Sequence, residues 1–160
     1  MRSLVVLVVL LLSASLVHAE DDPNYLYSLS FQRGMTMTRY AKPEYAESLR
    51  PARPEGVSIN WTFETKDDVP ESASQQEIEA INAAVSEALK SQRDAVLVLS
   101  SIVANRQGIW AFYTSDGASL ASALEASLKG KARIPVRFRV GKDPDWKAYT
   151  SFLARLRAEK

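Results

Sequence analysis

The sequence predicts an α+β fold in which helices pack against an antiparallel sheet. Short segments alternate apolar and polar side chains with the period of a half-buried strand, and Val57–Thr65 is the clearest of them. Other segments, Ile78–Leu89 and Leu120–Leu128, repeat apolar residues at helical spacing. The two kinds of segment are interleaved along the chain, and their order decides the class of fold.

The core of the predicted sheet is a hairpin within Ala95–Asp116. Two apolar runs rich in β-branched and aromatic residues are separated by the short polar stretch Asn105–Gly108. A pair of such runs joined by a few residues that include Asn and Gly is typical of a β-hairpin.

Two helices are expected on either side of this hairpin. Ser74-Gln-Gln-Glu77 is a capping box, which predicts that the first helix starts there and continues to Ser91. The second helix is predicted over Ala118–Lys129, with Gly130 as its C-terminal stop. The alternating segment Arg133–Val140 follows as a strand, and its internal Pro135 places it at a sheet edge.

A last helix is predicted after Asp143-Pro144-Asp145, with Asp143 as N-cap, Pro144 at the first helical position and Asp145 in the first turn. Trp146 and Tyr149 then begin the apolar stripe of this helix. We therefore interpret these two residues and the three before them, Asp143, Pro144 and Asp145, as a structural motif. Two other interpretations remain open at this stage. The two aspartates resemble a carboxylate pair for glycosidic hydrolysis, and the two aromatic rings are able to stack on a sugar or base.

From Val57 to Val140 the predicted order is strand, helix, strand, strand, helix, strand. This order is typical of a ferredoxin-like βαββαβ sandwich, in which the first and third strands are central and the fourth is an edge. Two elements are added to this sandwich: a strand at Tyr25–Phe31 before it, and the last helix after it at the C-terminus. Gly34–Gly56 is interpreted as a solvated connecting loop with at most a helical turn at Glu44–Leu49.

The first nineteen residues predict a secretory signal peptide. Arg2 precedes the apolar run Leu4–Leu12, and small residues follow at the expected cleavage site after Ala19. An uncleaved anchor needs about 20 apolar residues, more than this run supplies. We therefore expect an exported protein, periplasmic or extracellular, with no membrane span after cleavage. The mature chain Glu20–Lys160 is expected to form one α+β domain, with its core at about 57–153.

Composition excludes several kinds of chemistry. The one histidine, His18, lies in the predicted signal peptide, and the chain has no cysteine. Zinc sites of His or Cys, Ser-His-Asp and Cys-His nucleophiles and redox dithiols are therefore excluded from the mature chain, and no cofactor or metal is expected. Because its net charge is close to zero, no nucleic-acid partner is expected.

Three arginines are the candidate binding residues. Alternation places Arg133, Arg137 and Arg139 on one face of the last predicted strand. They either solubilise an edge strand or form a surface for an acidic partner. The favoured function is a non-catalytic binding module for a protein or an anionic envelope ligand. The alternative is a hydrolase that uses carboxylates or a Tyr/Lys pair.

Three motifs resemble a known bacterial family. They are Glu77–Leu89, Gly108-Ile-Trp-Ala-Phe-Tyr113 and Asp143-Pro-Asp-Trp146 with Tyr149 and Phe152-Leu153. Together they are similar to the domain of unknown function 695, over roughly Val57–Leu153. The resemblance implies an α+β architecture and a bacterial setting, and it implies no reaction.

Overall fold

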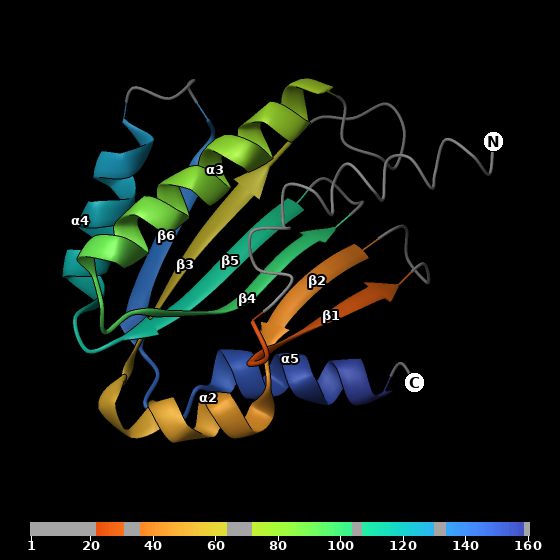
Figure 1. Ribbon diagram of the computed structural model, residues 1–160, viewed down its shortest axis with the longest axis vertical. Coiled ribbons are helices and arrows are strands. Elements are labelled where there is room, and N and C mark those ends of the chain that lie inside the picture. The colour runs from red at the N-terminus through yellow and green to blue at the C-terminus, as the bar shows by residue number, and fades with distance from the viewer. Residues whose placement is uncertain (1–21, 31–35, 64–71, 104–106, 130–133, 159–160) are drawn as a thin grey trace.

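The computed structural model describes residues 22–30, 36–63, 72–103, 107–129 and 134–158, and within them the chain forms an α+β fold with one six-stranded antiparallel sheet (Figure 1). The strands are β1 Tyr25–Ser30, β2 Thr36–Ala41, β3 Glu55–Thr62, β4 Val96–Val103, β5 Gln107–Thr114 and β6 Val136–Lys142. The helices are α2 Pro43–Leu49, α3 Ser72–Ser91, α4 Gly117–Leu128 and α5 Lys147–Ala158, with the short 3-10 helix η2 at Arg50–Ala52. Strand order across the sheet is β1-β2-β4-β5-β3-β6.

One face of the sheet packs against α3 and α4, and we call it the α3–α4 face. Its core contains Ile59 and Trp110 from the strands, Ile81 from α3 and Leu124 from α4, all of them buried. The apolar residues of each element recur at strand or helix spacing, so one face of each is removed from water. This is the packing that the alternating and helical patterns predict.

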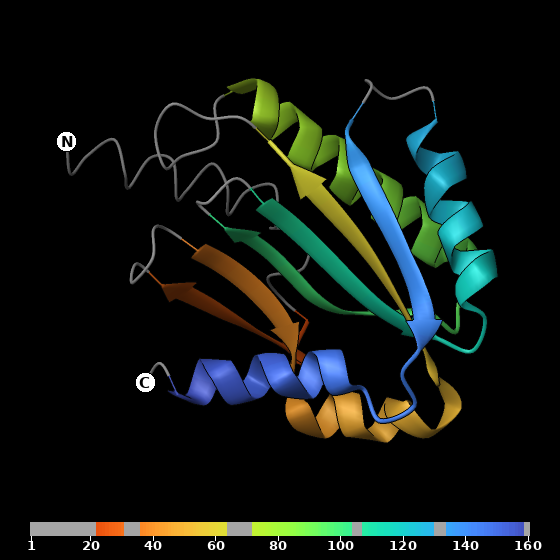
Figure 2. The same cartoon turned by 180° about the vertical axis from the view of Figure 1, so that it is seen from behind.

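The opposite face, which we call the α5 face, holds a second and smaller core. Tyr113, Val98 and Ala46 pack there with Trp146 and Tyr149 from the end of the chain. Seen from behind, α5 lies across one end of this face, and no helix of the described residues lies in front of the rest of β3, β5 and β6 (Figure 2). We call this region, which no described helix covers, the uncovered part of the sheet.

Several predicted elements are confirmed. β1 and β3 agree with their predicted segments within three residues at each end, and β4 pairs antiparallel with β5 as the hairpin predicts. α4 begins at Gly117, and the Asp116 carboxylate caps it by accepting a hydrogen bond from Ser119 N at 2.9 Å. β3 and β5 are adjacent inside the sheet, and β6 is an edge.

The loop predicted over residues 34–56 is wrong, because β2 and η2 lie there, whereas the helical turn predicted at Glu44–Leu49 is confirmed as part of α2. β2 buries residues on both faces: Thr38 and Tyr40 on the α5 face, and Met37 against the core of the other. A strand that packs side chains against the protein on both faces need not alternate apolar and polar residues. Its buried Thr38 hydroxyl is satisfied by Ser101 Oγ at 2.8 Å. The described part of the chain therefore has two strands before β3, where the sequence predicts one.

The capping box predicted at Ser74-Gln-Gln-Glu77 is also wrong. α3 begins at Ser72, so Ser74 is a buried residue of its first turn. The Glu77 carboxylate accepts a hydrogen bond from Trp61 Nε1 at 2.7 Å. A buried indole N–H needs an acceptor. The Glu77 carboxylate therefore bonds to Trp61 in the tertiary structure, and not to the N-terminus of α3 as the local pattern predicts.

Two proline positions need correction. Pro144 is not at the first helical position and Asp145 is not in the first turn, because α5 begins at Lys147 after a turn. For the same reason Asp143 is not at the N-cap position, although its carboxylate accepts hydrogen bonds from Lys147 N and Ala148 N. Pro135 precedes β6, so the edge position of that strand does not depend on a proline within it. The predicted signal peptide, Gly130 and Arg133 lie outside the described residues. No helix in the described part of the chain is long and apolar enough to cross a membrane.

Candidate functional site

Two of the three predicted arginines lie side by side on the uncovered part of the α5 face. In the β3–β6 register Arg137 is opposite Asn60 and Arg139 is opposite Ser58. The intervening Ile59 is buried against α3 and α4, so alternation directs these four side chains to the other face. Both arginines are exposed, and Asn60 Nδ2 donates to Ser58 Oγ at 3.1 Å. We call these four residues the arginine strip.

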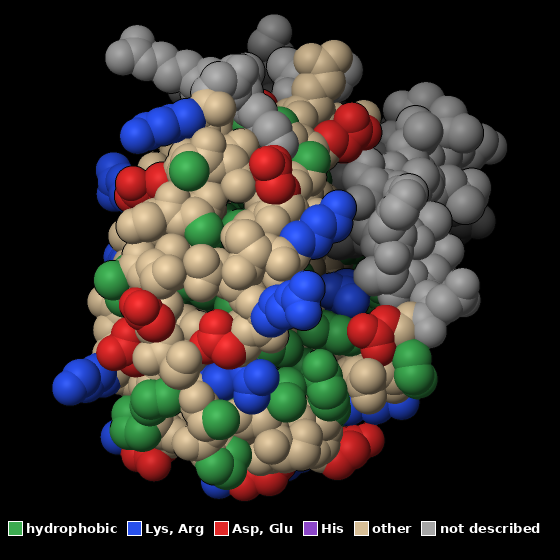
Figure 3. Space-filling view, turned by 60° about the vertical axis from the view of Figure 1, so that its left-hand side comes forward, with side chains coloured by type: hydrophobic (Ala, Val, Ile, Leu, Met, Phe, Trp, Pro, Cys, Tyr) green, Lys and Arg blue, Asp and Glu red, His purple; other side chains and the backbone are tan. Residues whose placement is uncertain are grey.

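The charge of the strip is not balanced by the sheet. Neither arginine has an ion-pair or hydrogen-bond partner for its side chain among the described residues. Glu55 is the only acidic residue in the six strands, and it is engaged on the α3–α4 face, where its carboxylate accepts Gly117 N at 2.7 Å. By contrast, acidic and basic side chains are mixed over the side of the molecule on which α4 lies (Figure 3).

A hollow of about 250 Å³ lies at the end of the arginine strip nearest to α5. Its base is a cross-strand pair of glycines, Gly56 opposite Gly141. We call it the glycine hollow. Its other lining residues are Val57, Ser58, Ala111, Phe112, Tyr113, Arg139, Val140, Lys142, Asp143 and Ala148.

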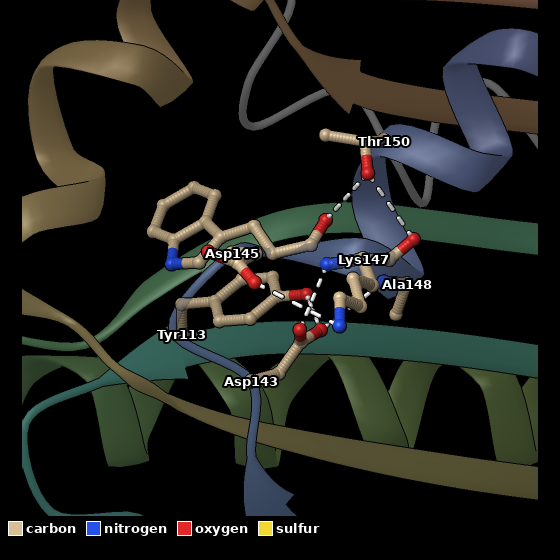
Figure 4. A network of polar contacts seen from close by, with 7 residues as sticks. Tyr113, Asp143, Asp145, Lys147, Ala148 and Thr150 are labelled. Atoms are coloured by element: carbon tan, nitrogen blue, oxygen red, sulfur yellow. Dashed lines mark hydrogen bonds and ion pairs between the residues drawn. The ribbon is translucent and has the colours of Figure 1, made fainter.

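Asp143 forms one wall of the glycine hollow and holds the start of α5 (Figure 4). Its carboxylate accepts hydrogen bonds from Tyr113 Oη at 2.7 Å, Lys147 N at 2.8 Å and Ala148 N at 3.1 Å. Burial raises the pKa of this carboxyl, but the bond from Tyr113 and the two amide bonds outweigh burial and leave the pKa below its ordinary value. The Tyr113 pKa is raised, first by burial and then by the bond to Asp143.

The remaining residues of the terminal motif point elsewhere. Asp145 is exposed, and its carboxylate lies 3.7 Å from Lys147 Nζ. Trp146 is buried, stacked on Tyr113 with ring centroids 4.1 Å apart, and its indole N–H donates to Arg53 O at 2.7 Å. Tyr149 is buried and donates to Ala41 O, whereas Pro144 is exposed. The two aspartates therefore face different surroundings, and both aromatic rings are inside the second core.

Sequence reasoning missed the glycine hollow. Its base requires Gly56 and Gly141 to be paired, and its wall requires Tyr113 and Asp143 to meet. These residues come from distant parts of the sequence, so no local spacing connects them. The basic residue Lys142, which also lines the hollow, is one residue beyond the predicted end of the strand.

Within the described residues, no three His, Cys, Asp or Glu side chains lie together as metal ligands. A family model described as "Family of unknown function (DUF695)" matches residues 38–154. No match to the chain was found among the curated proteins or the solved structures.

Proposed function

The chain belongs to the DUF695 family, and we propose that it is a non-catalytic binding module for an anionic partner. The observation that carries this proposal is the arginine strip: two exposed arginines that have no side-chain partner among the described residues, on a face of the sheet to which the described strands direct no acidic side chain. The partner is a protein or an anionic ligand of the cell envelope.

The geometry of the strip favours an acidic protein segment. Arg137 and Arg139 are two residues apart on one strand, a spacing of about 6.6–6.8 Å along the strand. Acidic side chains at alternate positions of an extended segment have the same spacing. Arginine also presents its donors in a planar fork that matches a carboxylate, so each guanidinium is able to receive one acid.

The alternative, a hydrolase built on carboxylates or a Tyr/Lys pair, has weaker support. Asp143 has its carboxylate occupied by three donors, and Asp145 is directed to solvent. Tyr113 has a raised pKa and its hydroxyl donates a hydrogen bond to Asp143, which makes it a poor base at neutral pH. No pair of free acids converges on the glycine hollow, whose lining includes Asp143 as its one carboxylate.

Two further parts of the proposal concern fold and location. We infer that β3–β6 with α3 and α4 form a ferredoxin-like unit, which the strand order β6-β3-β5-β4 supports, and to which β1 and β2 are added beyond β4. We also propose that the protein is exported, on the strength of the charge, apolar run and small residues of Met1–Ala19.

The test is binding of a fluorescent oligoglutamate peptide, followed by anisotropy. We expect saturable binding that weakens as salt rises, since exposed charges are screened beyond about 10 Å at 0.1 M. The double variant Arg137→Gln/Arg139→Gln should lose at least about tenfold in affinity. The control Arg155→Gln/Arg157→Gln removes the same charge from exposed positions of α5 and should bind like the wild type.

Vesicles of phosphatidylglycerol in phosphatidylcholine form the second arm, because they present an anionic envelope surface instead of a peptide. Binding to vesicles alone would assign the strip to a lipid headgroup. Equal binding of the peptide and the vesicles by the wild type and the arginine-strip variant would remove the strip as the binding surface.

A further inference from the structure

The glycine hollow has no explanation in the packing of the protein itself. A Cβ built on Gly141 meets no atom within 4 Å, and the φ angle of this residue is outside the left-handed region. Neither packing nor backbone conformation therefore requires glycine there, although glycine within a strand costs roughly 0.5–1 kcal/mol relative to alanine. A glycine in a strand often marks a place where a ligand approaches the backbone closely.

The partner glycine is different. A Cβ on Gly56 would lie 3.4 Å from Tyr113 Cε1, in contact with the ring. Gly56 thus allows Tyr113 to lie close to β3, while Gly141 leaves space open to solvent. The two together remove both side chains from one cross-strand pair and produce the hollow.

From this geometry we infer that the glycine hollow binds a single acidic side chain of the partner, with its carboxylate toward Arg139. This inference rests on the proposed function and names the group that the module recognises. Arg139 lines the hollow and is exposed, and its side chain has no partner among the described residues. Tyr113 and Ala148 provide carbon walls for the methylene groups of the incoming side chain.

Size and charge restrict the ligand to one side chain with a single negative charge. The volume of about 250 Å³ is below the roughly 300–1,000 Å³ typical of small-molecule sites. The charged side chains directed to this face of the hollow are one cation, Arg139, and one carboxylate, Asp143, whose oxygens already accept three hydrogen bonds. A dianionic phosphate would be repelled more strongly by this wall than a monoanionic carboxylate.

The experiment is a titration of the full chain, ¹⁵N-labelled, followed through its amide resonances. The probes are N-acetyl-glutamate amide, its neutral analogue N-acetyl-glutamine amide, and inorganic phosphate. We expect the glutamate probe to shift the Gly141, Lys142 and Gly56 resonances saturably, with a dissociation constant in the millimolar range. The glutamine probe should not shift them, and phosphate should bind at least about tenfold more weakly than the glutamate probe.

Variants distinguish binding in the glycine hollow from binding along the arginine strip. Gly141→Leu fills the hollow and keeps Arg139, so it should weaken binding of the glutamate probe at least about tenfold. Ser151→Leu adds the same side chain at an exposed position of α5 and should have no effect. Arg139→Gln, which leaves the hollow open, should also weaken the probe and serves as the second variant if Gly141→Leu fails to fold.

The inference is overturned if the glutamate probe causes no saturable shift at Gly141, if phosphate binds more tightly, or if Gly141→Leu binds like the wild type. Oligoglutamate binding distinguishes this failure from failure of the proposed function. If Arg137→Gln/Arg139→Gln abolishes oligoglutamate binding and Gly141→Leu does not, the protein binds its partner through the arginine strip and not through the glycine hollow.

Discussion

At the scale of single residues, Trp146 connects the end of the chain to the rest of the molecule. It is the one non-glycine residue with positive φ in the described part of the chain, at 51°. A bulky residue in this region carries a conformational cost, which the surroundings offset: the ring is stacked on Tyr113 and its N–H is bonded to Arg53 O. Its contacts hold α5 against the sheet beside the glycine hollow.

We therefore expect Trp146→Ala to lower the free energy of unfolding by about 3–5 kcal/mol, because a buried ring is lost and a cavity remains. Denaturant unfolding measures this loss. Trp146→Phe keeps a ring against Tyr113 and removes the bond to Arg53 O, so it should cost about 1–3 kcal/mol. A loss below about 1 kcal/mol for Trp146→Ala would show that the ring contributes little to stability, and would reopen a ligand-stacking role.

At the scale of elements, Asp94 connects two turns at one end of the sheet. It lies between α3 and β4, and its Oδ2 accepts Thr114 Oγ1 at 2.8 Å, Ser115 N at 2.8 Å and Ser115 Oγ at 2.6 Å. Thr114 ends β5, and Ser115 leads into α4. The bonds from Ser115 are the largest cause that lowers the pKa of Asp94 to about 2.

This shift predicts an acid-dependent loss of stability. Since the folded pKa is below the unfolded value of 3.8, the contribution of Asp94 is present above pH 3.8 and is lost as pH falls toward about 2. Asp94→Asn should lower stability at neutral pH by about 1 kcal/mol or less, because solvent screens the site, and should flatten the decline over that pH range.

Thermal unfolding at a series of pH values measures the effect of Asp94. The control is Glu125→Gln, which removes an exposed carboxylate from α4. If both variants follow the wild-type pH profile, the contacts of Asp94 do not contribute to stability.

At the scale of the whole molecule, the two faces of the sheet differ in how much of their surface the described helices cover. The α3–α4 face buries most of the large side chains, and the α5 face is covered at one end only (Figure 2). Because the covered face and the second core hold the sheet in place, the uncovered surface at β3 and β6 is able to carry exposed arginines and paired glycines. This separation of packing from surface is what a binding module requires.

Export is a prediction at the same scale. We expect the protein, when secreted from a bacterial host, to begin at Glu20, because signal peptidase cleaves after small residues at the −3 and −1 positions. Intact-mass measurement of the secreted fraction tests this. Ala19→Arg places a large charged residue at the cleavage site and should prevent processing, whereas Ala14→Ser, upstream of the site, should be processed normally. A secreted form that retains Leu4–Leu12 would contradict the assignment.

The sequence by itself determined the strongly periodic elements. β3, α3 and α4 each bury one face, so their apolar residues recur at the period of the element. The β4–β5 hairpin was recognisable as two apolar runs joined by a short polar stretch. The sequence also restricts the available chemistry, since the chain has no cysteine and its one histidine, His18, lies in the predicted signal peptide. The terminal motif was recognisable because Asp143 caps α5 through residues near it in the chain.

Only the tertiary structure decided the rest. β2 buries both of its faces and so has no period, and Glu77 is used by Trp61 instead of by the end of α3. The arginine strip needed the β3–β6 register to bring Asn60 and Ser58 beside Arg137 and Arg139. The glycine hollow depends on which residues face each other across strands, and pairing between distant segments is set by the packing of the whole chain, which no local pattern encodes.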